Sequence, residues 1–411
     1  MQEQSYKEKK VSKIRLFWFA VSSVFYVAFF FAIIPIMYAI YRLGGVFKLD
    51  MARYRSVVGR FWLEITRAWL SVVIGQNMTV ACDTRILGAK GRAIVISNHT
   101  TYMDWIYIWV ALIAAKKDPI IFVAKKEVSS VPILNLGIDM LKFILLTRDK
   151  SKDSATLLKG CDYASAAENS CVVIYPEGTF IDKNTKEGAD KFLQAQKDLE
   201  KQIEETEDLD EKNRLKEKLK IPSDITKSFD RVIFPKSFGL DTIKSSIKSI
   251  EYIINCTIFV KTPENAYPSV HYSGDRLFKG MFPDMESLVV CDYEDPEADP
   301  EREFRTDTSS YLYHTFAKKD ALLGDIDKLK YEQRRKYGDF MNQEFERKNE
   351  EKQYEVYTSS SLPSARLVMT VGSLTILSLV AYAIFIVAAF FFRFFIKINW
   401  SINDMFPEWT L

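Results

Sequence analysis

Two long apolar segments lie near the ends of the chain. Residues 16–41 and 367–392 contain no charged side chain, and about 20 apolar residues are enough for a helix to cross a bilayer. The first segment is longer than the apolar core of a signal peptide, which has about 7–15 residues, and no small-residue cleavage site follows it. We therefore expect transmembrane helices at both ends, with Pro35 causing either a kink or a helix that enters the membrane and returns.

Residues 61–74 have a mixed pattern, in which aromatic residues alternate with Glu64 and Arg67. This pattern is typical of an amphipathic helix, which lies either on the membrane surface or in the core of the following domain. Basic residues before and after the first apolar segment are nearly balanced in number, so the positive-inside rule assigns no orientation.

From residue 93 onward, short β-branched runs alternate with helical segments. The runs predicted to be buried strands are 93–97, 119–123, 171–175 and 253–260. Residues 105–115 and 154–168 are predicted to be helices. This alternation predicts an α/β fold with a mainly parallel sheet flanked by helices.

A charged segment interrupts this pattern at residues 183–220, where more than half of the side chains carry a charge. We interpret it as a solvated helix pair inserted in the domain; the alternative is a coiled coil that binds a partner. The predicted organisation is a membrane anchor with an amphipathic helix (1–80), the α/β domain (81–325), a charged helical linker (326–362), and a C-terminal transmembrane segment with a short tail (363–411).

Composition narrows the classes of function. Apolar residues make up 48% of the 411-residue chain, and the net charge of +2 provides no basic field for a nucleic-acid partner. Three histidines are too few for a zinc site with several imidazoles, and the five widely spaced cysteines form no C-x-x-C pair. We therefore expect no metal site and no disulfide framework, with reduced thiols in a cytosol-facing domain.

Two short polar segments directly follow predicted strands. Residues 98–105 read NHTTYMDW after the strand 93–97, and residues 175–180 read YPEGTF after the strand 171–175. In a parallel sheet both segments emerge at the carboxyl edge, where such folds gather their sites.

The first segment holds a histidine and a carboxylate that suit general-base catalysis. A neutral His99 can take a proton from an attacking hydroxyl, while Asp104 orients the ring and stabilises the imidazolium. Residues five positions apart do not lie on the same face of a helix, so the two side chains must meet across a turn. The alternative is a buried structural histidine and a helix-capping aspartate. The chain has no G-x-S-x-G elbow, so the acceptor alcohol is expected to attack directly.

Together these segments resemble the glycerolipid acyltransferases, a family that includes the lysophosphatidate acyltransferases. The four motifs of that family follow in order at residues 98–104, 125–148, 175–180 and 232–236. The resemblance covers residues 92–323 apart from the charged segment.

The resemblance implies roles for individual residues. His99 is the implied catalytic base and Asp104 its orienting carboxylate. Glu177, Gly178 and Thr179 are implied to line the substrate pocket, with backbone N–H groups at a helix start available to anionic oxygens and to the oxyanion.

Three further substrate-binding residues are implied by the second and fourth motifs. Lys125 and Arg148 are candidates for contacts with phosphates of the acceptor or of coenzyme A, and Pro235 for shaping the acyl pocket. The alternatives are ordinary solvated charges for the first two and a simple strand end for Pro235.

The acceptor is indicated by two details. Asp104-Trp105 and residues 316–323, which read FAKKDALL, resemble the branch that acylates lysophosphatidylinositol and lysocardiolipin. Phe180 stands where lysophosphatidate enzymes usually carry an arginine, a residue suited to binding a phosphate monoester. A lysophospholipid whose phosphate is already a diester is therefore the expected acceptor.

We thus expect a membrane-bound lysophospholipid acyltransferase that uses acyl-coenzyme A as co-substrate, no cofactor, and lysophosphatidylinositol as acceptor in phospholipid remodelling. The alternatives are a 1-acylglycerol-3-phosphate acyltransferase and a non-catalytic lipid-binding scaffold. The resemblance implies an endoplasmic reticulum membrane location. The catalytic domain is expected to face the cytosol, because acyl-coenzyme A is found there and a glycan at the Asn98 sequon would block His99.

Overall fold

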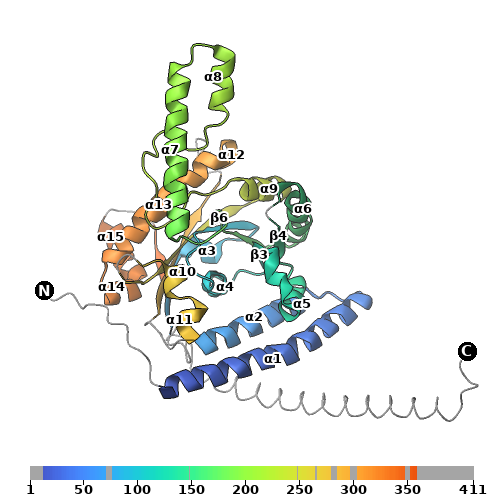
Figure 1. Ribbon diagram of the computed structural model, residues 1–411. Coiled ribbons are helices and arrows are strands. Elements are labelled where there is room, and N and C mark those ends of the chain that lie inside the picture. The colour runs from blue at the N-terminus through green and yellow to red at the C-terminus, as the bar shows by residue number, and fades with distance from the viewer. Residues whose placement is uncertain are drawn as a thin grey trace, which may run out of the picture.

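The computed structural model describes residues 13–70, 76–147, 149–247, 249–263, 266–278, 285–296, 303–347 and 352–358. Its centre is an eight-stranded sheet in the order β4-β3-β5-β2-β6-β7-β1-β8 (Figure 1). The strands are β1 (Asn77–Asp83), β2 (Ala93–Ser97), β3 (Ile120–Lys125), β4 (Ile144–Leu146), β5 (Cys171–Ile174), β6 (Tyr252–Val260), β7 (Glu286–Glu294) and β8 (Tyr354–Thr358). The predicted C-terminal transmembrane segment lies outside the described residues.

The sheet is mixed, with a parallel half that carries both predicted motifs. The pairs β4–β3, β3–β5, β5–β2 and β2–β6 are parallel, as is β7–β1, whereas β6–β7 and β1–β8 are antiparallel. The prediction of a mainly parallel α/β sheet flanked by helices is confirmed. The four predicted strands correspond to β2, β3, β5 and β6.

Helices cover both faces of the sheet because successive strand side chains alternate in direction. On β2, Ala93 and Val95 join one apolar cluster with α1 (Lys13–Val46), α2 (Ala52–Trp69), α4 (Asp104–Ala114) and α5 (Pro132–Leu141). Ile94 and Ile96 join a second cluster with α6 (Lys150–Ala166), α9 (Phe238–Ser246), α13 (Thr308–Lys328) and α15 (Tyr337–Arg347). Every side chain of β2 is therefore buried.

The long helix α1 is the one described helix that is long and apolar enough to cross a membrane, over Leu16–Val46. It runs beside α2 and α5 (Figure 1), where Phe30 contacts Trp62 with ring centroids 5.9 Å apart. Trp18 and Phe25 remain exposed. The helix continues through Pro35, so the alternative in which the chain turns back at that residue is wrong.

Helix α2 includes most of the segment predicted to be amphipathic. Val58, Trp62 and Leu63 are buried in the domain, and Trp62 lies 6.0 Å from Trp105 of α4 between ring centroids. Val57 is exposed. The apolar side of α2 thus packs on the domain, as expected for a core helix, the second of the two alternatives.

The charged segment forms the predicted helix pair, α7 (Lys183–Glu205) and α8 (Leu209–Lys216). The pair projects from the body of the domain (Figure 1). Asp182 begins α7 by accepting a hydrogen bond from the backbone N–H of Thr185 at 2.8 Å, and the Thr185 hydroxyl accepts one from the backbone N–H of Asp182, a reciprocal cap.

The segment expected to be a linker contributes to the domain itself. It contains α14 (Tyr331–Arg335), α15 and the edge strand β8, which pairs with β1 from Thr79 to Asp83. The remaining short helices are α3 (Thr84–Gly88), α10 (Pro268–His271), α11 (Gly274–Phe278), α12 (Glu303–Thr306) and the 3-10 helix η2 (Lys126–Ser130).

Candidate active site

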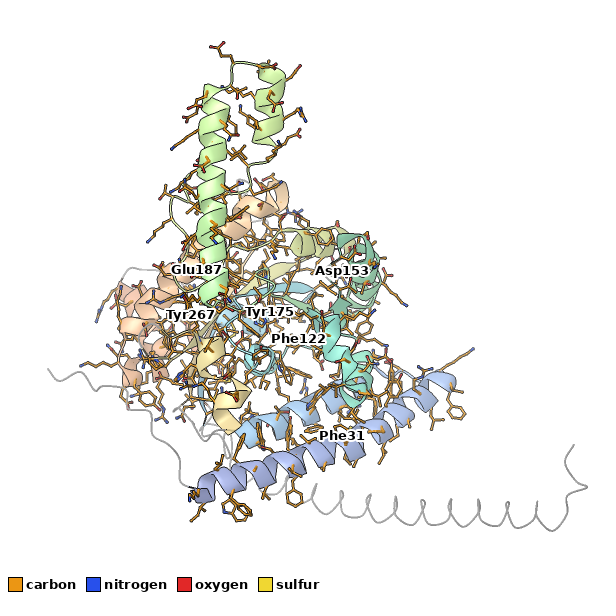
Figure 2. All side chains as sticks on the ribbon, in the orientation of Figure 1. Phe31, Phe122, Asp153, Tyr175, Glu187 and Tyr267 are labelled. Atoms are coloured by element: carbon orange, nitrogen blue, oxygen red, sulfur yellow. The ribbon has the colours of Figure 1, made fainter. Side chains whose placement is uncertain are left out.

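The two predicted motifs meet at the carboxyl edge of the parallel strands. Strands β2 and β5 are direct neighbours in register from Ala93 with Cys171 to Ile96 with Ile174, so the segments that follow them lie side by side. The backbone N–H of His99 donates a hydrogen bond to Glu177 Oε2 at 3.1 Å. Figure 2 shows Tyr175, which opens the second motif, within the body of the domain.

His99 and Asp104 form the expected pair across a turn. Nδ1 of His99 lies 2.8 Å from Oδ2 of Asp104. The side chain of Asp104 is fully buried, whereas that of His99 is 23% exposed. A buried carboxylate at Nδ1 favours the tautomer that leaves Nε2 unprotonated, and among the described residues no hydrogen bond to Nε2 is formed.

The turn between them is built around the Asp104 carboxylate. Oδ2 accepts the backbone N–H of Thr100 at 2.5 Å, and Oδ1 accepts that of Thr101 at 3.0 Å. The hydroxyls of both threonines donate to Oδ1 as well, at 2.8 and 2.9 Å. Asp104 is the first residue of α4, and the capping position belongs to Met103. The carboxylate therefore holds the preceding turn and the histidine together.

Asn98 fixes the start of this turn to the neighbouring strand β6. Its side-chain amide donates to the carbonyl of Ile258 at 2.9 Å, and its side-chain oxygen accepts the N–H of Ile258 at 2.7 Å. Asn98 is fully buried. The motif contained this residue, but its partner is far away in sequence and only the tertiary structure identifies it.

Aromatic side chains surround the imidazole of His99. Tyr175 stacks on it with centroids 4.5 Å apart and ring planes at 25°. The ring of Phe180 lies 4.1 Å from that of His99, and Tyr102 lies 4.5 Å from Phe180. Tyr102 is exposed. The residue that replaces the usual arginine thus contacts the candidate base directly.

The Glu177–Thr179 turn differs from the expected helix start. Gly178 has a φ of +68°, a left-handed conformation that favours glycine, and its N–H donates to the carbonyl of Tyr175 at 2.9 Å. Helix α7 begins only at Lys183. The expectation of helix-start N–H donors at Gly178 is therefore wrong, because this glycine closes a tight turn. Gly178 itself is exposed, and Thr179 is half-buried.

Glu177 is a buried carboxyl group in this turn, only 1% exposed. Burial raises its pKa well above the usual value, an effect opposed by backbone hydrogen bonds from His99 and Ile233 and by the charge of Lys319. Because it accepts the backbone N–H of His99, Glu177 can position the loop that carries this residue.

The other predicted substrate-binding residues are placed differently. Pro235 is buried, and the next residue, Lys236, donates its N–H to the carbonyl of Pro176 at 3.0 Å, so the fourth motif adjoins the Glu177 turn. Lys125 ends β3 at the carboxyl edge with an exposed side chain. Arg148 lies outside the described residues.

One buried charge near this site does not follow from the sequence pattern. Lys319 of α13 is 1% exposed, and its ammonium donates to the carbonyl of Cys256 at 2.5 Å. The segment FAKKDALL stands out in the sequence only by its resemblance, and the helical pattern alone leaves open which of its two lysines faces the sheet. Within the described ranges, no group of three or more histidine, cysteine or acidic side chains is arranged to hold a metal ion.

Comparisons with known proteins agree with the motifs. Residues 76–207 match the family model Acyltransferase. The chain is 27% identical over 166 residues to lysocardiolipin acyltransferase 1 of Danio rerio, covering 38% of this chain and 42% of that protein. It is 28% identical over 286 residues to 2-acyl-1-lysophosphatidylinositol acyltransferase of Saccharomyces cerevisiae, covering 65% of this chain and 70% of that protein.

Among solved structures, the 1-acyl-sn-glycerophosphate acyltransferase of Thermotoga maritima aligns with 72% of this chain and 97% of its own, at 13% identity and a TM-score of 0.34. The family-model and sequence matches confirm the predicted resemblance to the glycerolipid acyltransferases and to their lysophosphatidylinositol and lysocardiolipin branch.

Proposed function

We propose that this chain, an acyltransferase over residues 76–207 by its family match, moves an acyl group from acyl-coenzyme A to a hydroxyl of lysophosphatidylinositol. The observation that carries the proposal is the pair of His99 and fully buried Asp104, 2.8 Å apart at the carboxyl edge of the sheet. A histidine held in this way is prepared to act as a general base.

The chemistry follows from the tautomer of His99. With its Nδ1–H donated to Asp104, Nε2 removes the proton of the acceptor hydroxyl as that oxygen attacks the thioester carbonyl. The new ester C–O bond forms, the C–S bond breaks, and the proton on Nε2 passes to the departing sulfur. The buried carboxylate stabilises the imidazolium between these steps, and the transfer requires no cofactor.

The acceptor class is inferred from Phe180. Its ring lies against His99 and Tyr102 at the position where an arginine would bind a phosphate monoester by two hydrogen bonds. An apolar ring offers no such contact, which favours a phosphate diester carrying a head group. The printed names of the two relatives, a lysocardiolipin and a lysophosphatidylinositol acyltransferase, support the same class.

A membrane location is inferred from α1, which leaves Trp18, Phe25 and Phe31 exposed along an uncharged stretch. Figure 2 shows Phe31 on this helix. Exposed apolar side chains on this scale mark contact with lipid or protein, and both proposed substrates carry acyl chains. We place the enzyme at the endoplasmic reticulum membrane with its catalytic domain in the cytosol.

The test is an acyl-transfer assay on membranes that contain the protein, with one labelled acyl-coenzyme A and a panel of lysophospholipids. We expect product from lysophosphatidylinositol, and a loss of at least about 100-fold in His99→Gln. His314→Gln is the matched control, because that histidine is paired with Asp224 on the surface.

Each other result contradicts part of the proposal. Product chiefly from lysophosphatidate would overturn the reading of Phe180 and favour the 1-acylglycerol-3-phosphate alternative. Substantial activity in His99→Gln would overturn the mechanism. No product from any acceptor would favour a non-catalytic lipid-binding scaffold.

A further inference from the structure

Lys319 is a buried cation that has no hydrogen-bonded carboxylate among the described residues. Its ammonium donates to the carbonyl of Cys256 at 2.5 Å and lies 3.4 Å from both the carbonyl of Ile96 and the hydroxyl of Thr257. Burial lowers its pKa to about 8. Burying an ammonium group costs several kcal/mol unless its partners compensate, so the contacts of this group require an explanation.

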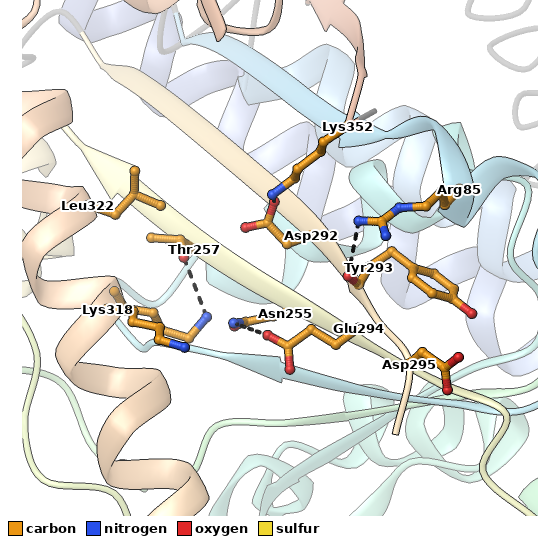
Figure 3. Close-up of a pocket in the computed structure, with 11 residues that line it drawn as sticks. Arg85, Asn255, Thr257, Asp292, Tyr293, Glu294, Asp295, Lys318, Leu322 and Lys352 are labelled. Atoms are coloured by element: carbon orange, nitrogen blue, oxygen red, sulfur yellow. Dashed lines mark hydrogen bonds and ion pairs between the residues drawn. The ribbon is translucent and has the colours of Figure 1, made fainter. Parts of the chain in front are cut away.

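The lysine lies at the inner wall of a cleft of 370 Å³ between α13 and the strands β6 and β7. Figure 3 shows this cleft, in which a dashed line marks the hydrogen bond to Thr257. Two acidic residues of the cleft attract the ammonium electrostatically but form their close contacts elsewhere: Asp292 pairs with Lys352 at 2.6 Å, and Glu294 accepts from Asn255 at 2.9 Å. The ammonium therefore acts on the backbone, through the carbonyls of Cys256 and Ile96.

The backbone that it holds leads directly to the candidate active site. Cys256 is aligned with Ser97, the last residue of β2, and two residues further along β6 Ile258 makes both hydrogen bonds with Asn98. His99 comes next. Lys319 thus contacts the end of β2 and the middle of β6, close to the point where the loop from Asn98 to Asp104 begins.

Glu177 holds the same loop from another side. It accepts the backbone N–H of His99 at 3.1 Å. The loop is therefore held from β6, whose backbone Lys319 binds, and from the Glu177 turn.

We propose that Lys319 is a positioning residue for His99: by binding the backbone carbonyls of Cys256 and Ile96, it keeps the Asn98–Asp104 loop in the geometry needed for proton transfer. The proposal rests on the proposed acyl transfer. A methionine of similar length would fill the same space, yet it would offer neither the donor nor the charge.

The main experiment compares Lys319→Met with Lys318→Met, its exposed neighbour on α13, in the full chain in membranes. We expect Lys319→Met to lower kcat at least about tenfold, because small misplacements of catalytic groups have large effects on rate. KM should change less than about twofold, since the lysine touches no proposed substrate site. Thermal stability should not fall, because a buried charge is replaced by an apolar group.

A second measurement is independent of activity. With only three histidines in the chain, the ring resonances of His99 can be assigned by NMR in detergent through their loss in His99→Gln. We expect one sharp set in the wild type and in Lys318→Met, and broadened or multiple resonances in Lys319→Met. Lys319→Gln, which keeps a donor without the charge, should lie between them.

The outcomes separate the two proposals. Wild-type kcat and unchanged His99 resonances in Lys319→Met would overturn the positioning role, as would a loss of activity that only follows a loss of folded protein. Failure of both Lys319 variants to fold, with Lys318→Met folded, would make the residue merely structural. An inactive wild type in which Lys319→Met still broadens the His99 resonances would refute the acyl-transfer function and retain the positioning role.

Discussion

Replacing Asp104 by asparagine exchanges one oxygen of the side chain for an NH₂ group and removes the charge, with little change in volume. The two oxygens of this carboxylate accept five hydrogen bonds, two from backbone N–H groups, two from hydroxyls and one from His99. An asparagine can keep only one of the two oxygen positions as an acceptor, so each orientation of the amide loses a different set of contacts.

With the NH₂ group at the Oδ2 position, it faces the N–H of Thr100 and can donate to Nδ1 of His99. The ring then adopts the tautomer with its proton on Nε2, which cannot act as a base. With the NH₂ group at the Oδ1 position, it faces the N–H of Thr101, while the hydroxyls can rotate to accept. The tautomer survives, but the imidazolium loses its carboxylate.

Both orientations leave a buried backbone N–H opposite a donor, which costs about 1–3 kcal/mol of folding stability. The loss of general-base catalysis corresponds to a fall in kcat of about 10²–10⁴-fold, or about 3–5 kcal/mol in the barrier. We therefore expect Asp104→Asn to remain folded and to lose nearly all turnover.

The assay measures the initial rate of coenzyme A release with saturating lysophosphatidylinositol, alongside denaturant unfolding of each variant. Asp83→Asn is the matched control, because Asp83 is also fully buried and accepts the N–H of Arg85 at the end of β1, which runs opposite to β2. A similar stability loss with normal kcat is expected there. If Asp104→Asn kept a kcat within about tenfold of the wild type, our assignment of His99 as a base oriented by Asp104 would be refuted.

Two further predictions concern the acceptor and the effect of pH. Phe180→Arg should raise the ratio of kcat/KM for lysophosphatidate over lysophosphatidylinositol at least about tenfold, because a guanidinium beside His99 can bind a phosphate monoester; an unchanged ratio in parallel rate measurements would contradict this. Burial lowers the pKa of Lys319 from 10.5 to about 8, so between these values the unfolded chain binds more protons than the folded one. The free energy of unfolding should then rise with pH from about 8 to 10.5, by up to about 3 kcal/mol. Denaturant titrations in detergent across that pH range should show this rise in the wild type and not in Lys319→Met. An equal rise in Lys319→Met would contradict the assignment.

Local patterns in the sequence were sufficient for four of the five strands in the parallel half of the sheet. The strands β2, β5 and β6 are short runs of apolar, mostly β-branched residues that are buried throughout, and such runs can be identified without reference to distant residues. The strand β4 of that half, which has only three residues, and the strands β7, β1 and β8 were not predicted. β8 lies in a charged stretch, so its identity as a strand depends on its pairing with β1.

The candidate site residues His99, Asp104 and Glu177 could be identified from the sequence, because they lie in short motifs that directly follow recognisable strands. What holds them in place depends on contacts that only the folded chain brings together. Asn98 with Ile258 and Lys319 with Cys256 join segments that are far apart in the chain, and Gly178 closes a turn instead of starting a helix. Periodicity reports only which side of an element is apolar, whereas the partner of a buried polar group is fixed by how distant elements pack.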